Sequence, residues 1–291
     1  RCAAPVRGMQ ETSVLGQRIA YVRQGAGQTL VMLHGLGADS SQCVGPFGKL
    51  EGVDLICPDM PGHGQSPPGE YSFARFAELI AAFLDRLGIE RAVFGGISMG
   101  SALSLRLALE HPEMVDGLVL VRPAWIDRRA LPQLSLVARV GRWLEDAPEE
   151  ALARLEADAE FIAIARANAP AAQSIRGLFL RPQAESSAAV LNAMVHDRPF
   201  ADLKALADIA CPALVIANDG DPLHPVAVAQ DIFAHLPEAR YALLPSRYLA
   251  PNEHFAALRG EIDAFLGLRG DHNVYRAHHD RGHSRQAQGQ G

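Results

Sequence analysis

The stretch Gly96-Ile97-Ser98-Met99-Gly100 decides the fold of this chain. It follows the apolar run 92–94 and precedes a helical pattern from Ala102 to Glu110. A G-x-S-x-G pattern between a strand and a helix is typical of a nucleophile elbow, in which the serine occupies a strained turn. The two glycines let neighbouring backbone pass without a Cβ clash, and the start of the helix favours negative charge. Ser98 is therefore the candidate nucleophile.

Short apolar runs alternate with helical patterns on both sides of this stretch. Val14 to Arg23 suggests a first hairpin, and apolar strands are expected at 29–33, 53–57, 92–97, 118–121, 213–217 and 241–244. Helices are expected at 73–87, ending at Gly88, and at 102–110 and 254–266. Such alternation predicts parallel pairing through crossovers and a sheet with helices on both faces. The expected fold is α/β, a doubly wound and mostly parallel sheet.

The alternation stops between residues 125 and 202, where strand-like runs give way to helical periodicity interrupted by prolines. We interpret 125–202 as a helical cap inserted into a core formed by 14–124 and 203–268. Residues 1–13 are expected to form a flexible N-terminal segment. Residues 269–291, rich in Arg, His, Gly and Gln, are expected to form a disordered tail.

Composition narrows the class of protein. The 291 residues are 48% hydrophobic, enough to bury the core of one large domain. The net charge of −6 argues against nucleic acid as a partner. The four cysteines have no C-x-x-C spacing, and no stretch has the length and apolarity of a membrane span or a signal peptide. We expect a cytoplasmic protein with no nucleic acid or membrane partner; the oligomeric state is left open.

Four segments, taken together, resemble the α/β-hydrolase family, specifically its members with a helical cap. In chain order these are His34-Gly35-Leu36-Gly37, the stretch 59–66 (Asp-Met-Pro-Gly-His-Gly-Gln-Ser), the elbow around Ser98, and Asn218-Asp219-Gly220-Asp221-Pro222. The resemblance covers roughly 14–268. It implies the same α/β fold and a serine nucleophile activated by a histidine and an acid.

The resemblance also implies an oxyanion hole made by the backbone N–H groups of Leu36 and Met99. The side chains around them matter less than these amides. For His34 we expect a buried imidazole that hydrogen-bonds backbone and holds the loop in shape. For His63, between two glycines in a tight turn, we likewise expect a structural hydrogen bond rather than proton transfer.

Two aspartates compete for the role of the acid, which the family places after the nucleophile and before the histidine. Asp221 precedes Pro222 at the end of a predicted strand and matches the family pattern. Asp219 is the rival, and its alternative role is to form the turn by bonding its own loop. We assign Asp221 as the acid.

The histidine is where this chain departs from the family. Most members carry Gly-His shortly after the last strand, but this chain has Pro245-Ser246-Arg247-Tyr248 there. His254, at the start of the last predicted helix, is the imidazole we select as the base. The alternatives are that His254 has no chemical role, so that the protein binds rather than hydrolyses, or that His224, three residues after Asp221, is a reserve base.

The expected function is a serine hydrolase that cleaves an ester, thioester or comparable acyl bond of a small-molecule substrate, without a cofactor or a metal. Carbon–carbon bond hydrolysis uses the same residues and stays an alternative, as does a non-hydrolytic or very slow ligand receptor. The cap aromatics Trp125, Trp143, Phe161 and Phe179 either line an apolar substrate pocket or pack the cap onto the core.

Overall fold

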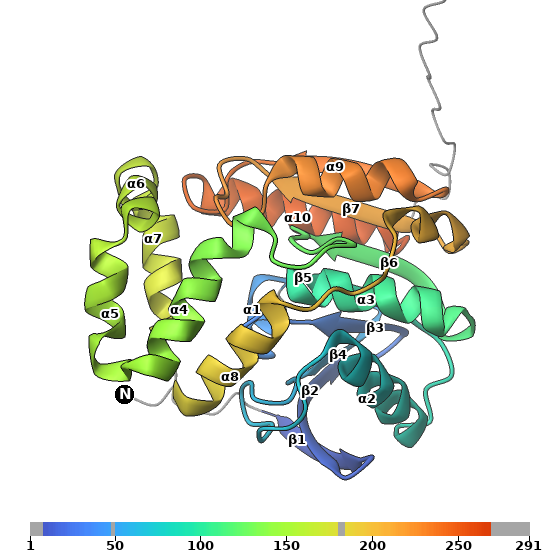
Figure 1. Ribbon diagram of the computed structural model, residues 1–291. Helices are drawn as coiled ribbons and strands as arrows, with labels where there is room; N and C mark the ends of the chain where they lie inside the picture. The colour runs from blue at the N-terminus through green and yellow to red at the C-terminus, as the bar shows by residue number, and fades with distance from the viewer. Residues whose placement is uncertain (1–7, 48–49, 180–183, 269–291) are drawn as a thin grey trace, which may run out of the picture.

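The computed structural model describes residues 8–47, 50–179 and 184–268. Its centre is an eight-stranded sheet in the order β1-β2-β4-β3-β5-β6-β7-β8 (Figure 1). The strands are β1 (Met9–Val14), β2 (Gln17–Gly25), β3 (Gln28–Leu33), β4 (Val53–Pro58), β5 (Ala92–Ile97), β6 (Val115–Val121), β7 (Ala213–Asn218) and β8 (Ala239–Leu244). The pairs β1–β2 and β2–β4 are antiparallel, and all others are parallel. The predicted α/β fold with a mostly parallel sheet is confirmed.

The N-terminal hairpin begins earlier than the sequence pattern indicated. Residues 9–13, which we expected in a flexible segment, belong to β1 and pair with β2 from Met9 opposite Val22 to Val14 opposite Gln17. The turn at Leu15 and Gly16, both with positive φ, joins the two strands. The segment 1–7 and the predicted tail 269–291 lie outside the described residues.

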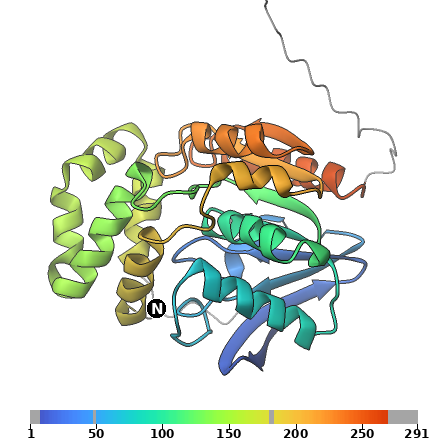
Figure 2. The same cartoon turned by 45° about the vertical axis from the view of Figure 1, so that its right-hand side comes forward.

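Helices cover both faces of the sheet, as Figures 1 and 2 both show. The helices of the core are α1 (Ser41–Phe47), α2 (Phe73–Arg86), α3 (Met99–Glu110), α9 (Val226–His235) and α10 (Pro251–Phe265), with short 3-10 turns η1 (Pro112–Met114) and η4 (Leu203–Asp208). Side chains of β3 alternate between two apolar clusters. Val31 and Leu33 join the cluster that contains residues of α2, α3 and α9, whereas Leu30 and Met32 join that of α1 and α10.

Helix α2 illustrates how the sequence produces these layers. Ser72 caps its start, because the Ser72 hydroxyl accepts a hydrogen bond of 3.0 Å from the Arg75 amide. The helix ends at Arg86, Leu87 is its C-cap, and Gly88 takes a positive φ of 70°. Its buried face consists of Phe73, Phe76, Ala77, Leu79, Ile80, Phe83 and Leu84. Burying each of the larger apolar side chains stabilises the fold by roughly 1.5–3 kcal/mol.

The insertion between β6 and β7 is helical, as predicted. It contains η2 (Pro132–Leu134), α4 (Ser135–Asp146), α5 (Pro148–Ala157), α6 (Ala159–Ala167), α7 (Ala169–Arg176), η3 (Gly177–Phe179) and α8 (Ala184–Val195). Asp158 separates α5 from α6, because its carboxylate accepts hydrogen bonds from the amides of Glu160 and Phe161 and so starts a new helix. The insertion gathers to one side of the sheet (Figure 1).

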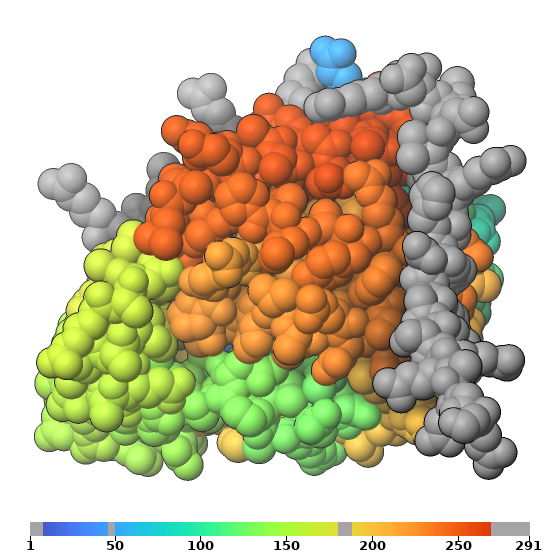
Figure 3. Space-filling model, turned by 90° about the horizontal axis from the view of Figure 1, so that it is seen from above, coloured from blue at the N-terminus to red at the C-terminus, as the bar shows by residue number. Residues whose placement is uncertain are grey.

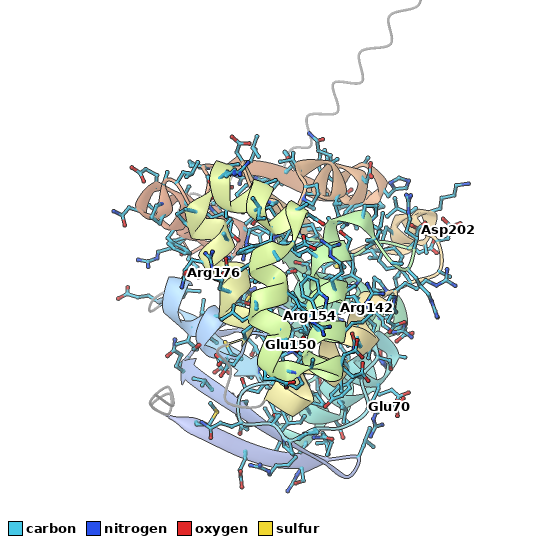
Figure 4. All side chains as sticks on the ribbon, turned by 60° about the vertical axis from the view of Figure 1, so that its left-hand side comes forward. Glu70, Arg142, Glu150, Arg154, Arg176 and Asp202 are labelled. Atoms are coloured by element: carbon cyan, nitrogen blue, oxygen red, sulfur yellow. The ribbon has the colours of Figure 1, made fainter. Side chains whose placement is uncertain are left out.

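Charged side chains cover the outer surface of the cap, and Figure 4 labels four of them, Arg142, Glu150, Arg154 and Arg176. Arg154 pairs with Glu150 one helical turn earlier at 2.8 Å. Exposed pairs of this kind contribute at most about 1 kcal/mol. Within the described residues, no helix is both long and apolar enough to cross a membrane.

Candidate active site

The site forms at the edge of the sheet where the parallel strands end. Ser98 follows β5, Arg122 follows β6, Asp221 lies three residues beyond β7, and Arg247 lies three residues beyond β8. Because parallel strands present their carboxyl ends on the same edge, residues far apart in the chain come together there. This edge is the usual place for ligands in open α/β sheets.

Ser98 has the strained backbone of the predicted elbow. Its backbone angles, φ of 57° and ψ of −109°, lie in a region that residues other than glycine rarely adopt. The Ser98 amide donates to the Val121 carbonyl at 2.9 Å, which ties the turn to β6. The elbow therefore presents the hydroxyl at the start of α3 with 9% of the residue exposed.

The two flanking glycines are required by close backbone contacts. A Cβ on Gly96 would lie 2.0 Å from the carbonyl carbon of Gly100, and one on Gly100 would lie 2.0 Å from the Leu33 carbonyl oxygen. Both obstacles are backbone atoms, so neither can swing aside. These contacts confirm the prediction that neighbouring backbone passes too close to positions 96 and 100 for a Cβ atom.

The loop after β3 lies against the elbow. A Cβ added to Gly35 would lie 3.6 Å from the Ser98 Cβ, and the Gly35 amide donates to Gln42 Oε1 at 2.7 Å. No acceptor among the described residues takes the Leu36 amide hydrogen. Met99 is the first residue of α3, so its amide has no partner within the helix. Among the described residues, the Leu36 amide thus has no acceptor and the Met99 amide has none within α3, as is needed for two amides expected to bind an oxyanion.

His34 and His63 have the structural roles that we expected. His34 Nε2 accepts from the Met60 amide at 2.9 Å, and its Nδ1 lies 2.9 Å from the Gly35 carbonyl. His63 Nε2 accepts from the Gly37 amide at 3.0 Å. Both rings are buried and bond backbone, so they hold the loop that carries Leu36.

His224 is the imidazole that contacts the nucleophile. Its Nε2 lies 2.8 Å from Ser98 Oγ, and its Nδ1 lies 2.9 Å from Asp221 Oδ1. With the proton on Nδ1, facing the carboxylate, Nε2 has a lone pair for the Ser98 proton. The three groups therefore stand in the order serine, imidazole, carboxylate that acyl-transfer chemistry needs.

The acid and the base come from one short turn, Asp221-Pro222-Leu223-His224-Pro225. The His224 amide approaches the Asp221 carbonyl at 3.4 Å, which closes the turn. The buried Nδ1 lies 2.9 Å from Asp221 Oδ1, but the contact does not have the geometry of a hydrogen bond. The neutral imidazole and the carboxylate are therefore in close polar contact.

Arg122 balances the charge of Asp221. Its Nη1 lies 3.1 Å from Asp221 Oδ2, the Arg122 side chain is 5% exposed and the Asp221 side chain is fully buried. Burial alone would raise the pKa of Asp221, but His224 and Arg122 together outweigh it and hold the pKa well below the ordinary value. Asp221 is thus ionised. Asp219, the rival, is exposed and accepts a bond from the Gly220 amide, as its turn-forming role predicts.

Burial also sets the protonation of His224. Removing the ring from water lowers its pKa, Asp221 acts in the opposite direction, and the Arg122 and Arg247 guanidinium groups add to the lowering. The net effect is a pKa below the ordinary value of 6.5. The imidazole is consequently neutral near pH 7, which is the form that accepts a proton.

The selection of His254 as the base is wrong. His254 lies in the first turn of α10, is 1% exposed, and directs Nδ1 to the Pro245 carbonyl at 2.9 Å. Its ring packs edge-on against Phe255, with centroids 5.2 Å apart. His254 therefore holds the loop after β8 in place, while the reserve candidate His224 contacts Ser98. The signal in the sequence was the Asp-Pro-x-His-Pro turn, whose two prolines restrict the backbone around the acid and base.

An open pocket of about 430 Å³ lies beside the acid. It is lined by Ala163, Ile164, Ala167 and Asn168 of the cap and by Asn218, Gly220, Asp221, Pro222 and Val226 of the core. Asn168 Nδ2 donates to the Gly220 carbonyl at 3.0 Å, so one hydrogen bond joins the cap to the acid turn. Figure 3 shows this face, with the yellow-green cap against the orange segments that follow β7.

The four cap aromatics do not line this pocket. Trp125 is 1% exposed, stacks edge-on against Phe73, and donates its indole N–H to the Met194 carbonyl at 3.1 Å. Phe161 is equally buried and lies under the Arg176 guanidinium. Trp143 and Phe179 are partly exposed and pack against the large apolar cluster, which contains residues of both the cap and the core. Of the two roles considered for these side chains, packing is the one for which the structure gives contacts. Within the described ranges, no three His, Cys, Asp or Glu side chains gather into a metal site.

Comparison with known proteins agrees with this geometry. The family model of the alpha/beta hydrolase fold matches residues 28–248. A protein from Pseudomonas savastanoi pv. phaseolicola with the provisional name carbamate hydrolase is 31% identical over 223 residues, which cover 74% of this chain and 84% of that protein. A thermophilic esterase from Thermogutta terrifontis, solved with malate bound, superposes with a TM-score of 0.70 at 21% identity, covering 89% of this chain and 97% of the esterase.

Matches to the first curated relatives are shorter. An uncharacterised protein from Mycobacterium tuberculosis is 36% identical over 116 residues, which cover 39% of this chain and 34% of that protein. This match spans about a third of the relative, so it carries no information on the activity of the whole protein.

Proposed function

Because this chain belongs to the alpha/beta hydrolase fold family, we propose that it is a serine hydrolase of esters, thioesters or comparably activated acyl groups. The observation that carries the proposal is the contact of 2.8 Å between His224 Nε2 and Ser98 Oγ, with Asp221 on the opposite ring nitrogen. A serine hydroxyl needs such a base to attack a carbonyl at neutral pH. The resemblance to a solved esterase supports the same class of substrate.

Each residue of the site then has a role in the reaction. Ser98 Oγ attacks the acyl carbon as His224 takes its proton, and the oxyanion that forms accepts hydrogen bonds from the Leu36 and Met99 amides. His224 returns the proton to the leaving group, which departs and leaves an acyl group on Ser98. Water, deprotonated by His224, then releases the acid. Asp221 stabilises the imidazolium formed in both steps.

Covalent labelling tests the proposal directly. A fluorophosphonate probe is expected to phosphonylate Ser98 Oγ with loss of fluoride, giving one adduct on the peptide that contains residue 98. Mass spectrometry of the digest locates the adduct, and Ser98→Ala provides the negative control. Ser101→Ala is the matched control, because Ser101 is buried and bonds the Gly96 carbonyl at 2.7 Å, so this variant should label normally. A folded wild-type protein that stays unlabelled would contradict the proposal and favour a receptor.

The pH dependence tests the role of His224. Only the neutral imidazole accepts a proton, and burial lowers the pKa of His224 below 6.5. As the pH falls, protonation of His224 removes the active form. Because its pKa lies below 6.5, we expect kcat/KM for an activated ester to fall to half of its plateau at a pH below 6.5. Initial rates from pH 4.5 to 8, with a nitrophenyl ester, measure this limb. A midpoint above 6.5 would contradict the assignment.

A further inference from the structure

We propose that Arg247 binds an anionic group of the substrate, so that the preferred acyl compounds carry a carboxylate a few bonds from the scissile carbonyl. The proposal rests on the proposed function and names its substrate class. It is drawn from the position of Arg247 at the strand edge, from its surroundings, and from the balance of charge around Asp221.

The loop that carries Arg247 is fixed against the catalytic turn. The Asp219 amide donates to the Leu244 carbonyl at 3.1 Å, and a Cβ on Gly220 would lie 3.6 Å from Ser246 Oγ. His254 holds the same loop from behind through the Pro245 carbonyl. The loop therefore cannot drift from the site without breaking these contacts, and Arg247 is held at the edge that carries Ser98 and Asp221.

Tyr248 contacts both the Arg247 guanidinium group and the cap. The Arg247 Cζ lies 4.9 Å from the centre of the Tyr248 ring, a cation–π distance. The Tyr248 hydroxyl contacts the Ser174 side chain in α7 of the cap. Arg247 itself is partly exposed, so part of its surface is open to a ligand.

The charges of the site leave Arg247 without a carboxylate. Asp221 is ion-paired to Arg122, and no carboxylate oxygen of the described residues lies within ion-pair distance of Arg247. Its electrostatic neighbours are Arg122, Asp221, Tyr248, His224 and His254. Burial and the Arg122 charge lower the pKa of Arg247, whereas Tyr248 and Asp221 act in the opposite direction.

A carboxylate of the substrate supplies that partner. A guanidinium group presents a planar fork of N–H donors that matches a carboxylate in two parallel hydrogen bonds. The bonds form before chemistry and persist through it, so they act mainly on binding and on orientation at Ser98. A neutral substrate leaves the cation unpaired and loses this contribution.

A matched pair of esters tests the proposal. 4-Nitrophenyl valerate and mono-4-nitrophenyl glutarate have acyl chains of equal length and differ only by a terminal methyl or carboxylate. For the wild type we expect kcat/KM to favour the glutarate ester by about 10- to 100-fold, the range of a hydrogen bond to a charged group. In Arg247→Gln this ratio should fall to near one, mainly through KM, and Arg247→Lys should give an intermediate ratio. Arg259→Gln, which removes an exposed arginine in α10, should keep the wild-type ratio.

The pattern of change separates binding of the anion from other roles. If Arg247 acted on the oxyanion or on folding, kcat for both esters would fall in parallel in Arg247→Gln and the ratio would persist, which would overturn the proposal.

Loss of the Arg247 charge should also raise the pKa of His224, because a nearby cation disfavours the imidazolium, and so shift the acid limb of kcat/KM to higher pH. A limb that stays in place would show that the guanidinium does not face the site.

A binding measurement keeps this inference separate from the proposed function. Calorimetric titration of Ser98→Ala with glutaramate and with pentanamide needs no turnover. We expect glutaramate to bind about 10-fold or more tightly than pentanamide, and the preference to vanish in Ser98→Ala/Arg247→Gln. A preference in this assay without ester hydrolysis by the wild type would sink the hydrolase proposal alone, whereas equal binding of the two amides would sink the role of Arg247 alone.

Discussion

Replacing His224 with alanine is expected to lower kcat for an activated ester by about 10⁴- to 10⁶-fold, the cost of removing the base from a serine triad. The reason is that His224 Nε2 is the only imidazole nitrogen of the described residues that lies against Ser98 Oγ. Without it the hydroxyl has to lose its proton to solvent, and the leaving group has no acid. Steady-state hydrolysis of 4-nitrophenyl acetate, with circular dichroism to check the fold, measures the effect.

His254→Asn provides the matched control. Asparagine Nδ2 takes nearly the position of histidine Nδ1, so the bond to the Pro245 carbonyl is retained while the imidazole is lost. We expect turnover within a few-fold of the wild type. If His254→Asn were inactive and His224→Ala active, the contact seen at Ser98 would not be the one used in catalysis.

Replacing Asp221 with asparagine is expected to reduce kcat on the order of 10⁴-fold, the loss that this substitution causes in a serine protease triad. Two effects add. The amide does not stabilise the imidazolium, and it leaves the Arg122 guanidinium buried at 5% exposure without its counter-charge. Both disfavour a positive charge on His224, so the acid limb of the residual activity should move to lower pH. The pH profile of the variant measures this shift.

Asp219→Asn is the control for this variant. Asp219 lies two residues earlier and is exposed, and its carboxylate accepts a hydrogen bond from the Gly220 amide of its own turn. Asparagine keeps a carbonyl oxygen for that amide. Activity should be unchanged, and an equal loss in both variants would mean that the turn, rather than the carboxylate, is what matters.

Much of the fold was predictable from local pattern. The strand β5, the glycines of the elbow and the helical insertion follow from short-range constraints, namely burial, turn geometry and periodicity. Helices α1 and α9 were not predicted from the sequence. Helix α1 is seven residues long and contains Gly45 and Pro46, both poor helix formers, and α9 lies between the acid turn and β8 with no capping side chain at its start.

The base of the site was harder to predict, because its identity depends on the paths of two loops. The sequence places His224 and His254 on either side of β8, and both lie near the carboxyl edge of the sheet. What separates them is orientation: the Asp221 turn folds His224 toward Ser98, whereas the first turn of α10 points His254 at backbone. Family order favoured the later histidine, and the rigid turn between two prolines was the better guide.

The sharing of one five-residue turn by the acid and the base has an evolutionary consequence. In a protein whose proton acceptor sits beyond β8, every insertion or exchange in that loop risks the chemistry itself. Here the segment 245–250 supplies none of the three side chains Ser98, His224 and Asp221, so a substitution within it can change which molecules are accepted while those three side chains are retained. Proteins descended from such a chain can vary their substrate range through this one segment and still inherit the same catalytic residues.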